Sequence, residues 1–224
     1  MPDYNGYAVI WDVDGTLVDT AKQHYDAWVM LARELDKPFT DADFAATFGR
    51  RNPEIIRQLF GEHYNDQEVL DLGNRKEDFY REAARQGVEP LPGVRALMKD
   101  LHAAGYKQAI GSSAPRGNLE LIMELTGLEH YFEAMVGQED TSRGKPDPQV
   151  FLVAAQKLNV APDKCLVLED AIAGVQAAKA GGMKCIAVTF VGHHSDEILQ
   201  DAGADLIVNS LEEVSVETVQ KILG

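Results

Sequence analysis

The chain has 224 residues, of which 45% are hydrophobic, 8% aromatic and 25% charged. This composition is typical of a globular protein and excludes disordered, collagen-like and disulfide-scaffold chains. The 21 Lys and Arg against 36 Asp and Glu give a net charge of −15, which opposes sequence-independent binding to nucleic acid or to an anionic membrane. A phosphate ligand would therefore need a local site that overcomes the overall field.

The chain contains two cysteines, Cys165 and Cys185, each within an apolar run. A small secreted domain would normally carry more, so a reduced, cytoplasmic location is expected. The N-terminus has no basic segment before an apolar stretch, and nowhere do about 18 consecutive apolar residues occur. We therefore expect no signal peptide and no membrane span, and the size and charge suit a monomer.

The first predicted strand, Tyr7–Trp11, is followed by a long region without a convincing strand. Its apolar residues recur at helical spacing. A Pro/Gly-rich segment from Gly87 to Gly93 then returns the chain to strand-forming sequence. We interpret residues 19–87 as an all-helical cap domain, inserted between the two parts of a core domain formed by residues 1–18 and 88–224. The helices predicted in the cap are Thr20–Leu35, Asp41–Thr47, Pro53–Phe60 and Gln67–Arg85.

After the cap, short apolar runs alternate with helical segments, which is typical of βαβ units in a parallel sheet. Gly93–Ala104 is predicted as a helix that ends before Gly105, and Ala171–Ala180 as one that ends at Gly181. The predicted fold is an α/β protein with a three-layer, Rossmann-like parallel sheet. The remaining predicted strands are Tyr106–Gly111, Ala134–Gly137, Cys165–Leu168, Lys184–Thr189 and Asp205–Val208.

Polar residues follow the first four predicted strands. In open parallel sheets, the loops after the carboxyl ends of the strands converge at one edge, where ligands bind. We therefore expect the side chains of these loops to share a site. In chain order they are Asp12, Asp14 and Thr16, then Ser112 and Ser113, then Lys145, then Glu169 and Asp170.

Carboxylates gathered at one point repel one another unless a hard cation lies between them, and Mg²⁺ is the usual small cation for carboxylate and phosphate oxygens. Asp12, Glu169 and Asp170 are the natural ligands, and Asp14 is counted with them. Lys145, Ser112, Ser113 and the turn through Thr16 would supply the charge and the hydrogen-bond donors that phosphate oxygens need. The combination predicts a phosphate site with a magnesium ion.

The chain lacks the glycine-rich P-loop sequence, so the phosphoryl group must be handled in another way. A carboxylate can attack phosphorus and form an aspartyl-phosphate. Asp12 is the candidate nucleophile, and Asp14 the candidate general acid and base. Because alternate residues of a strand point to opposite faces, Asp14 must lie beyond the strand, in a turn that Gly15 permits.

Simpler roles remain open for several of these residues. Asp170 could cap the helix that follows it. Lys145 could be a surface lysine, and the hydroxyls of Ser112 and Thr16 could only stabilise turns. His24 could pack on a helix face beside Trp28 without any role in the site.

Taken together, the ordered set resembles the four motifs of the haloacid dehalogenase superfamily, in its branch with a helical cap. The resemblance implies a Mg²⁺-dependent enzyme that forms an aspartyl-phosphate. It also implies that Asp14 marks a phosphatase or phosphomutase rather than a dehalogenase. The segments that carry it are Asp12–Asp19, Ser112, Lys145-Pro146 and Glu169-Asp170.

The predicted cap resembles that of the β-phosphoglucomutase subfamily from Asp19 to Trp28. The resemblance implies that His24 pairs with the acid/base aspartate until substrate closes the cap, and that Lys76 binds phosphate. The mutases carry an arginine three residues after a cap glycine, whereas here Asn52 follows Gly49 at that spacing. Arg50 and Arg51 are the candidates to replace it.

We therefore expect a Mg²⁺-dependent phosphohydrolase that acts on a small phosphorylated metabolite, with sugar phosphates as the favoured class. The alternative is a sugar phosphomutase of the β-phosphoglucomutase type. A remote alternative is a non-catalytic binding protein on the same fold. Specificity in capped enzymes depends on the cap and its closure, so the sequence leaves the ester unidentified.

Overall fold

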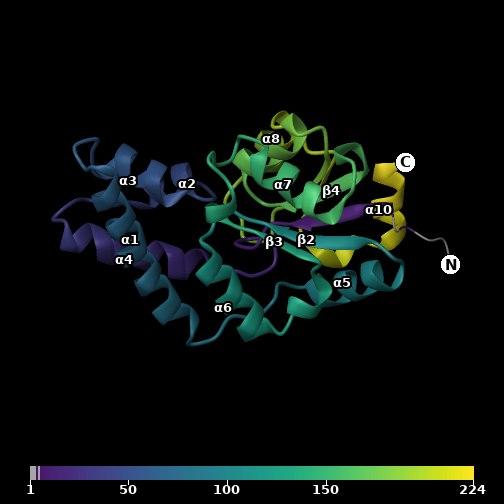
Figure 1. Cartoon of the computed structure of the whole chain (residues 1–224), viewed down its shortest axis with the longest axis horizontal. Helices are drawn as coiled ribbons and strands as arrows, with labels where there is room; N and C mark the ends of the chain where they lie inside the picture. Colours follow the sequence, from purple (N-terminus) through teal and green to yellow (C-terminus); the bar gives the residue numbers. More distant parts are fainter. Residues whose placement is uncertain (1–3, 5) are drawn as a thin grey trace.

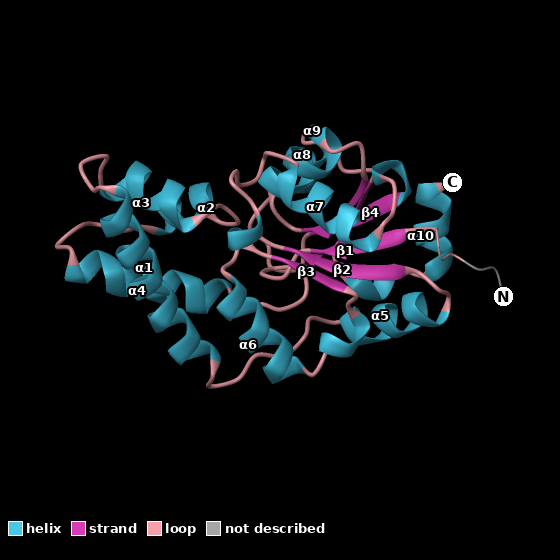
Figure 2. Cartoon of the chain, in the orientation of Figure 1, coloured by secondary structure: helices cyan, strands magenta, loops and turns pink. Residues whose placement is uncertain are grey.

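The centre of the molecule is a six-stranded, all-parallel sheet with the strand order β3-β2-β1-β4-β5-β6 (Figure 2). The computed structural model describes Tyr4 and residues 6–224. All six predicted strands are present, and each end lies within one residue of its prediction. The strands are β1 (Ala8–Trp11), β2 (Lys107–Gly111), β3 (Ala134–Val136), β4 (Cys165–Glu169), β5 (Lys184–Val188) and β6 (Leu206–Val208).

Helices cover both faces of the sheet and make it the middle of three layers (Figure 1). On one face lie α5 (Val94–Ala103), α6 (Arg116–Thr126) and α10 (Val216–Leu223). On the other lie α7 (Gln149–Leu158), α8 (Ile172–Ala180) and α9 (Asp196–Asp201). Short 3-10 helices complete the connections: η1 (Glu129–Tyr131), η2 (Gln138–Asp140), η3 (Pro162–Lys164) and η4 (Leu211–Glu213).

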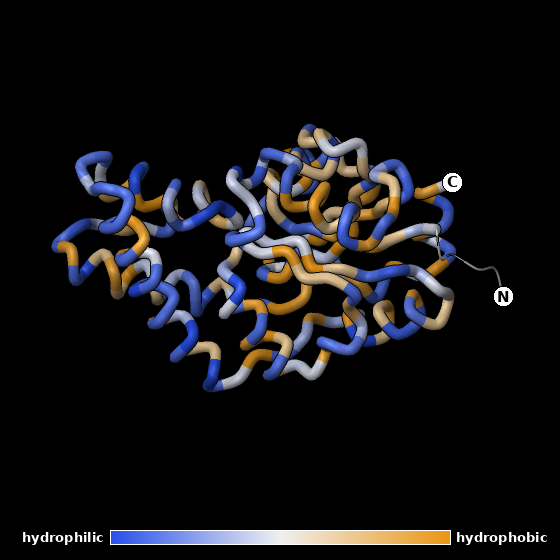
Figure 3. Tube along the Cα trace, viewed as in Figure 1, coloured by the Kyte–Doolittle hydropathy of each residue, from blue (hydrophilic) through white to orange (hydrophobic). Residues whose placement is uncertain are grey.

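The strands build this arrangement through their alternation. In β1, Val9 and Trp11 join the apolar cluster under α5 and α6, whereas Ala8 and Ile10 join the cluster under α7 and α8. Both sets are fully buried, as expected for a strand with a helix layer on each side. The apolar character of the inner strands is visible along the trace (Figure 3).

Four helices between β1 and α5, together with Thr20 before the first of them and the loops that join them, form a separate body at one end of the molecule (Figure 1). We call this body the helical region. Its helices bury their own apolar cluster, which includes Trp28, Leu31 and Phe60. On the strength of this separate cluster we propose the division into a cap of residues 19–87 and a core of 1–18 and 88–224. Of the core, residues 1–3 and 5 lie outside the described residues. The helices are α1 (Ala21–Glu34), α2 (Asp41–Thr47), α3 (Asn52–Phe60) and α4 (Asp66–Ala84).

The chain leaves the sheet and returns to it along neighbouring segments. Val18 pairs with Pro90 in an antiparallel bridge, and the amide of Leu91 donates to the carbonyl of Leu17 at 2.9 Å. The helical region is therefore joined to the core by two neighbouring segments, one that contains Leu17 and Val18 and one that contains Pro90 and Leu91. Both lie next to the turn that follows β1. Within Tyr4 and residues 6–224, none of the helices has both the length and the apolar character needed to cross a membrane.

Candidate active site

The candidate site lies where β1 and β4 run side by side in the middle of the sheet. β1 pairs with β2 on one side and with β4 on the other, so the connections on the two sides diverge at this point. Asp12 directly follows β1, Glu169 is the last residue of β4, and Asp170 comes next. The order of strands thus brings together acidic residues that are far apart in the sequence.

Lys145 reaches these carboxylates from the loop before α7. Its side chain is 1% exposed, and its Nζ donates to Asp12 Oδ1 at 2.6 Å and to Glu169 Oε1 at 2.5 Å. Burial alone would lower the pKa of Lys145, but the two carboxylates raise it, so the lysine is a cation. The alternative of an ordinary surface lysine is therefore wrong.

Glu169 is held by contacts on both of its oxygens. Oε1 accepts from Lys145, and Oε2 accepts from the amides of Asp170 and Ala171 at 2.7 and 2.6 Å. Gly174, in the first turn of α8, lies directly against this carboxylate. A Cβ at Gly174 would overlap the Glu169 side chain, so the glycine leaves the space in which Glu169 orients Lys145.

Replacing Gly174 with alanine tests this arrangement. Alanine normally favours a helix over glycine by about 1 kcal/mol. Here we expect a loss of about 1–3 kcal/mol in the free energy of unfolding, because the methyl group overpacks the site. Catalytic activity should fall as well, since Glu169 must move away from Lys145. Urea unfolding and initial rates measure the two effects.

The matched control is Gly117→Ala. A Cβ at Gly117, in the first turn of α6, would meet only Arg81 Nη1, at an ordinary 3.7 Å. This variant should be as stable as the wild type or slightly more so. A gain in stability at both positions would show that Gly174 has no packing role at the site.

The carboxylate of Asp170 has no hydrogen-bond partner among the described residues, although both of its oxygens are buried. The N-cap of α8 is Ala171, so the alternative role of Asp170 as a helix cap is wrong. Gly15 faces this carboxylate at φ 88°, and a Cβ there would overlap it. A buried acid without a partner is costly unless something else compensates its charge.

Asp12, Glu169 and Asp170 each offer an oxygen atom, and these three atoms lie within 4.8 Å of one another. Burial raises the pKa of Asp12 to about 8 despite the opposing charge of Lys145. Burial and the neighbouring carboxylates also raise the pKa of Asp170 well above its usual value. One lysine does not neutralise three acids, and the unpaired oxygens of Asp170 fit a hard divalent cation such as Mg²⁺.

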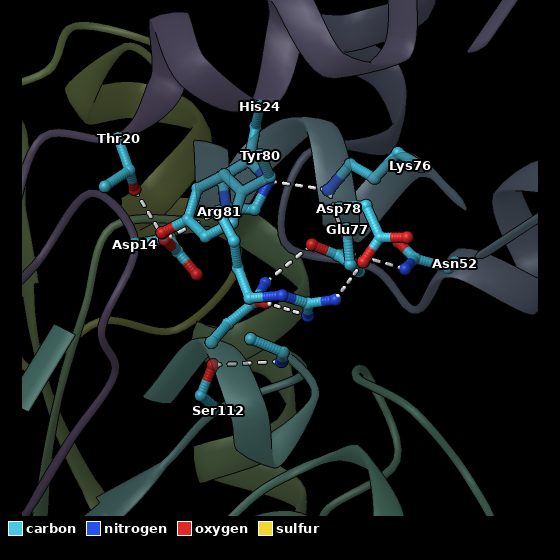
Figure 4. A network of polar contacts seen from close by, with 12 residues as sticks. Asp14, Thr20, His24, Asn52, Lys76, Glu77, Asp78, Tyr80, Arg81 and Ser112 are labelled. Atoms are coloured by element: carbon cyan, nitrogen blue, oxygen red, sulfur yellow. Dashed lines mark hydrogen bonds and ion pairs between the residues drawn. The ribbon is translucent and has the colours of Figure 1, made fainter. Parts of the chain in front are cut away.

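Asp14 belongs to a different set of contacts. A tight turn, in which the carbonyl of Val13 accepts from the amides of Leu17 and Val18 at 2.9 and 3.1 Å, carries it beyond β1. The sequence predicts Asp14 as a metal ligand, but its carboxylate contributes no oxygen to the group of three. Its Oδ1 instead accepts from Thr20 Oγ1 at 2.5 Å and lies 3.0 Å from His24 Nε2 (Figure 4).

The partners of Asp14 keep it ionised. Burial would raise its pKa, but the charge and hydrogen bond of His24 and the hydrogen bond of Thr20 lower the pKa of Asp14 to about 2. The His24 ring stacks on Tyr80 with the ring centres 4.0 Å apart. Lys76 Nζ lies 2.7 Å from His24 Nδ1 on the other side of the imidazole. The sequence assigned His24 correctly to the neighbourhood of Asp14, whereas its gating role stays a prediction.

Hydroxyl groups from two loops complete the core side of the site. Ser112 and Ser113 line the cavity between the sheet edge and the helical region. Ser112 Oγ accepts from the amide of Ala114 at 3.1 Å. The buried hydroxyl of Thr16 has no hydrogen-bond partner among the described residues. Thr16 is fully buried and is not among the residues that line the cavity, so its contact with a ligand stays a prediction.

The helical region presents three basic residues that the sequence had proposed for substrate. Lys76 is 2% exposed, lines the cavity and donates to Glu77 Oε1 at 2.9 Å. Arg50 lines the cavity, but its guanidinium pairs with Glu54 and Gln58. Arg51 is not among the cavity-lining residues, and its Nη2 donates to the carbonyl of Gln138 at 3.2 Å. Of the two candidates to replace the mutase arginine, only Arg50 lines the cavity, and its role toward substrate stays a prediction.

Several residues of the site have no feature in the sequence that identifies them as site residues. Thr20 precedes α1 and resembles an ordinary N-cap, yet its side chain makes no capping bond and binds Asp14 instead. Glu77 and Tyr80 are positions of α4 that helical spacing alone does not distinguish. Asn118, on α6, binds Glu77 and Arg81 across the boundary between core and helical region.

Comparisons with known proteins agree with this geometry. Residues 9–188 match the family model of the haloacid dehalogenase-like hydrolases. The chain is 34% identical over 214 residues to the phosphorylated carbohydrates phosphatase of Thermotoga maritima, covering 93% of this chain and 97% of that protein. It is 32% identical over 222 residues to the β-phosphoglucomutase of Bacillus subtilis, covering 96% and 94%. A crystal structure of the β-phosphoglucomutase from Clostridium difficile superimposes with a TM-score of 0.87 at 25% identity, over 97% of this chain and 96% of that one.

Proposed function

The chain belongs to the haloacid dehalogenase-like hydrolase family, and from this membership we propose that it is a Mg²⁺-dependent phosphatase of small phosphorylated metabolites. Sugar phosphates are the favoured class, because the phosphatase of Thermotoga maritima is named for phosphorylated carbohydrates. The proposed reaction is hydrolysis of a phosphoric monoester through an aspartyl-phosphate intermediate on Asp12.

The observation that carries this proposal is the buried group of Asp12, Lys145 and Asp170 at the ends of β1 and β4. Lys145 occupies only one oxygen of Asp12, and Asp12 Oδ2 has no hydrogen-bond partner among the described residues. A free carboxylate oxygen beside a buried cation is suited to attack on phosphorus. Asp12 and Asp170, with Glu169 behind them, would hold Mg²⁺.

When bound, the magnesium ion would supply positive charge that favours the ionised form of Asp12 and offsets the charge of the phosphoryl oxygens. Lys145 would contribute a second positive charge to the same oxygens. Ser112 and the unpartnered hydroxyl of Thr16 would donate hydrogen bonds to them. The side chains that would surround the phosphoryl group come from four loops that the sheet holds in place. They are therefore already positioned before the reaction begins.

In the first step, an Asp12 oxygen forms a bond to phosphorus while the bond from phosphorus to the ester oxygen breaks. Asp14 donates a proton to the leaving alcohol. In the second step, Asp14 takes a proton from water, and the water oxygen attacks phosphorus and releases Asp12 and inorganic phosphate. Asp14 thus gives one proton in the first step and regains one from water in the second.

The contacts of Asp14 impose a condition on the first step. With a pKa of about 2, Asp14 is ionised near neutral pH and cannot donate a proton. The hydrogen bonds from Thr20 and His24 stabilise this ionised form. We therefore propose that substrate binding separates Asp14 from these two residues, which belong to the helical region, before the leaving group is protonated.

A phosphomutase is the second candidate, and the contact of His24 with Asp14 favours it, as does the similarity to the β-phosphoglucomutase of Bacillus subtilis. Such an enzyme would transfer the phosphoryl group to a second sugar hydroxyl instead of water. It would also have to exclude water from the phosphoenzyme.

Phosphorus NMR separates the two candidates. The protein is incubated with Mg²⁺, β-glucose 1-phosphate and a trace of glucose 1,6-bisphosphate, and the products are resolved. We expect inorganic phosphate to accumulate. Accumulation of glucose 6-phosphate instead would identify a mutase, and the absence of any turnover on a wider panel of esters would contradict the proposed function.

A further inference from the structure

Glu77 is a buried carboxylate in the helical-region wall of the cavity, and the proposed chemistry does not use it. The residue is 2% exposed and lines the cavity. Its Oε1 accepts from Asn52 Nδ2 at 2.6 Å and from Lys76 Nζ at 2.9 Å (Figure 4). Its Oε2 accepts from Asn118 Nδ2 at 2.6 Å. These contacts lower the pKa of Glu77 even though burial would raise it, so it is an anion.

Each cation that could attract a second anionic group at this wall already has a carboxylate partner. Lys76 pairs with Glu77, and Arg50 pairs with Glu54. His24 is occupied by Asp14 and Lys76. A dianionic phosphate placed here would lie beside Glu77 and would compete with the carboxylate partners that Lys76 and Arg50 already have, and like charges brought together in an interface oppose binding.

The same wall is suited to hydroxyl groups. The side-chain amide of Asn52 donates one hydrogen bond to Glu77. Its side-chain carbonyl oxygen has no hydrogen-bond partner among the described residues. Glu77 Oε2 accepts a single hydrogen bond and can accept another. Apolar side chains adjoin these acceptors, as is common in sites for uncharged ligands. The apolar residues that line the cavity include Trp28, Phe44, Phe48 and Ile55.

We propose that Glu77 and Asn52 are specificity-determining residues that admit an uncharged, polyhydroxylated leaving group and reject a substrate with a second phosphate. This inference rests on the proposed phosphatase function and narrows it to monophosphates of neutral polyols. It also separates the chain from a mutase, which must bind a bisphosphate intermediate. Glu77 and Asn52 contact the alcohol and do not take part in the reaction at phosphorus.

The test compares the monophosphate and the bisphosphate of one sugar, using fructose 1-phosphate with fructose 1,6-bisphosphate and glucose 1-phosphate with glucose 1,6-bisphosphate. Phosphate release is measured with Mg²⁺ present, alongside p-nitrophenyl phosphate, whose leaving group has no hydroxyl to reach Asn52. We expect kcat/KM of the wild type to be at least about tenfold higher for the monophosphate of each pair.

Two variants and one control test whether Glu77 and Asn52 cause the preference for the monophosphate. Glu77→Gln and Asn52→Arg should each reduce the preference by about tenfold, through a lower KM for the bisphosphate, because the first removes an anion and the second adds a cation. The kcat for p-nitrophenyl phosphate is measured for each variant, so that a general loss of activity is distinguished from a change in preference. Glu82→Gln makes the same charge change at an exposed position of α4, and the preference should match that of the wild type.

The outcomes separate this inference from the function on which it rests. If the wild type releases phosphate from no ester at all, the proposed function fails. If it hydrolyses p-nitrophenyl phosphate but neither sugar phosphate, or cleaves bisphosphates at least as well as monophosphates, the specificity inference is overturned and the phosphatase function stands. If Glu77→Gln fails to fold, the inference is still tested by the wild-type ratio of kcat/KM between monophosphate and bisphosphate and by the Asn52→Arg variant.

Discussion

Replacing Asp12 with asparagine will lower the rate of phosphate release by at least about a thousandfold, because an amide cannot form the phosphoryl bond that the proposed mechanism requires. The change keeps the size of the side chain, and the amide oxygen can still accept from Lys145. The variant should therefore remain folded. Initial rates on p-nitrophenyl phosphate, with circular dichroism to check the fold, measure both parts of this expectation.

Asp19→Asn is the matched control for this variant. Asp19 lies on the same loop after β1 but is exposed, and its side chain accepts only a weak bond from the amide of Ala21 at 3.3 Å. Its removal should leave the rate close to that of the wild type. Activity of Asp12→Asn above about one percent of wild type, with contaminating phosphatase excluded, would remove Asp12 from the mechanism.

Asp170→Asn should produce opposite effects on catalysis and on stability. Catalysis should require at least about 10–100-fold more Mg²⁺ for half-maximal rate, since one of the proposed ligands loses its charge. The metal-free variant should be more stable than the metal-free wild type, because the amide has no charge to bury and can donate to the neighbouring carboxylates. A gain of about 1 kcal/mol corresponds to a rise of about 2–4 °C in Tm for a chain of this size.

The stability effect has a defined pH dependence. The pKa of Asp170 is raised in the folded protein by burial and by the neighbouring carboxylates. The unfolded chain therefore releases this proton at a lower pH than the folded protein does. The contribution of Asp170 to the stability of the wild type falls as the pH rises from about 4 through the folded pKa, and the variant lacks this contribution. The difference in Tm between the two should thus grow with pH.

Thermal unfolding at several pH values, with EDTA or with Mg²⁺, measures both effects. Mg²⁺ should raise the Tm of the wild type and have little effect on the variant, because only a bound ligand stabilises the folded state. EDTA should abolish wild-type activity, and excess Mg²⁺ should restore it. Unchanged activity in EDTA, or the same Tm gain with Mg²⁺ in both proteins, would contradict the assignment of Asp170 as a ligand.

Much of the fold follows from local pattern. The six strands are short runs of mostly apolar residues, fully buried in β1 and β4 and partly buried in the edge strands β3 and β6. The glycine signals at Gly105 and Gly181-Gly182 mark helix ends that the structure also has. Of the core helices after β2, only α8 has boundaries that the sequence predicts; α6 and α9 carry weak boundary signals and are expected only as a class. Capping boxes at Thr40 and Asn65 mark the starts of α2 and α4 directly.

The sequence by itself determined which chemistry the molecule can hold. Acidic residues, a lysine and hydroxyls follow the strands of a parallel sheet, and the carboxyl ends of such strands share one edge, so the meeting of Asp12, Lys145, Glu169 and Asp170 could be predicted. That inference needs only the alternation of strands and helices and the rule for where open sheets bind ligands.

Only the tertiary structure decided how each carboxylate is used. Asp12 and Asp14 are two residues apart, yet the turn at Val13–Val18 sends one to Lys145 and the other to Thr20 and His24. The directions of Arg50 and Arg51 and the triple contact of Glu77 depend on packing between α3, α4 and α6. The physical reason is that a carboxylate's partners are set by contacts across long sequence separations, as between Glu77 and Asn118, and local spacing does not encode them.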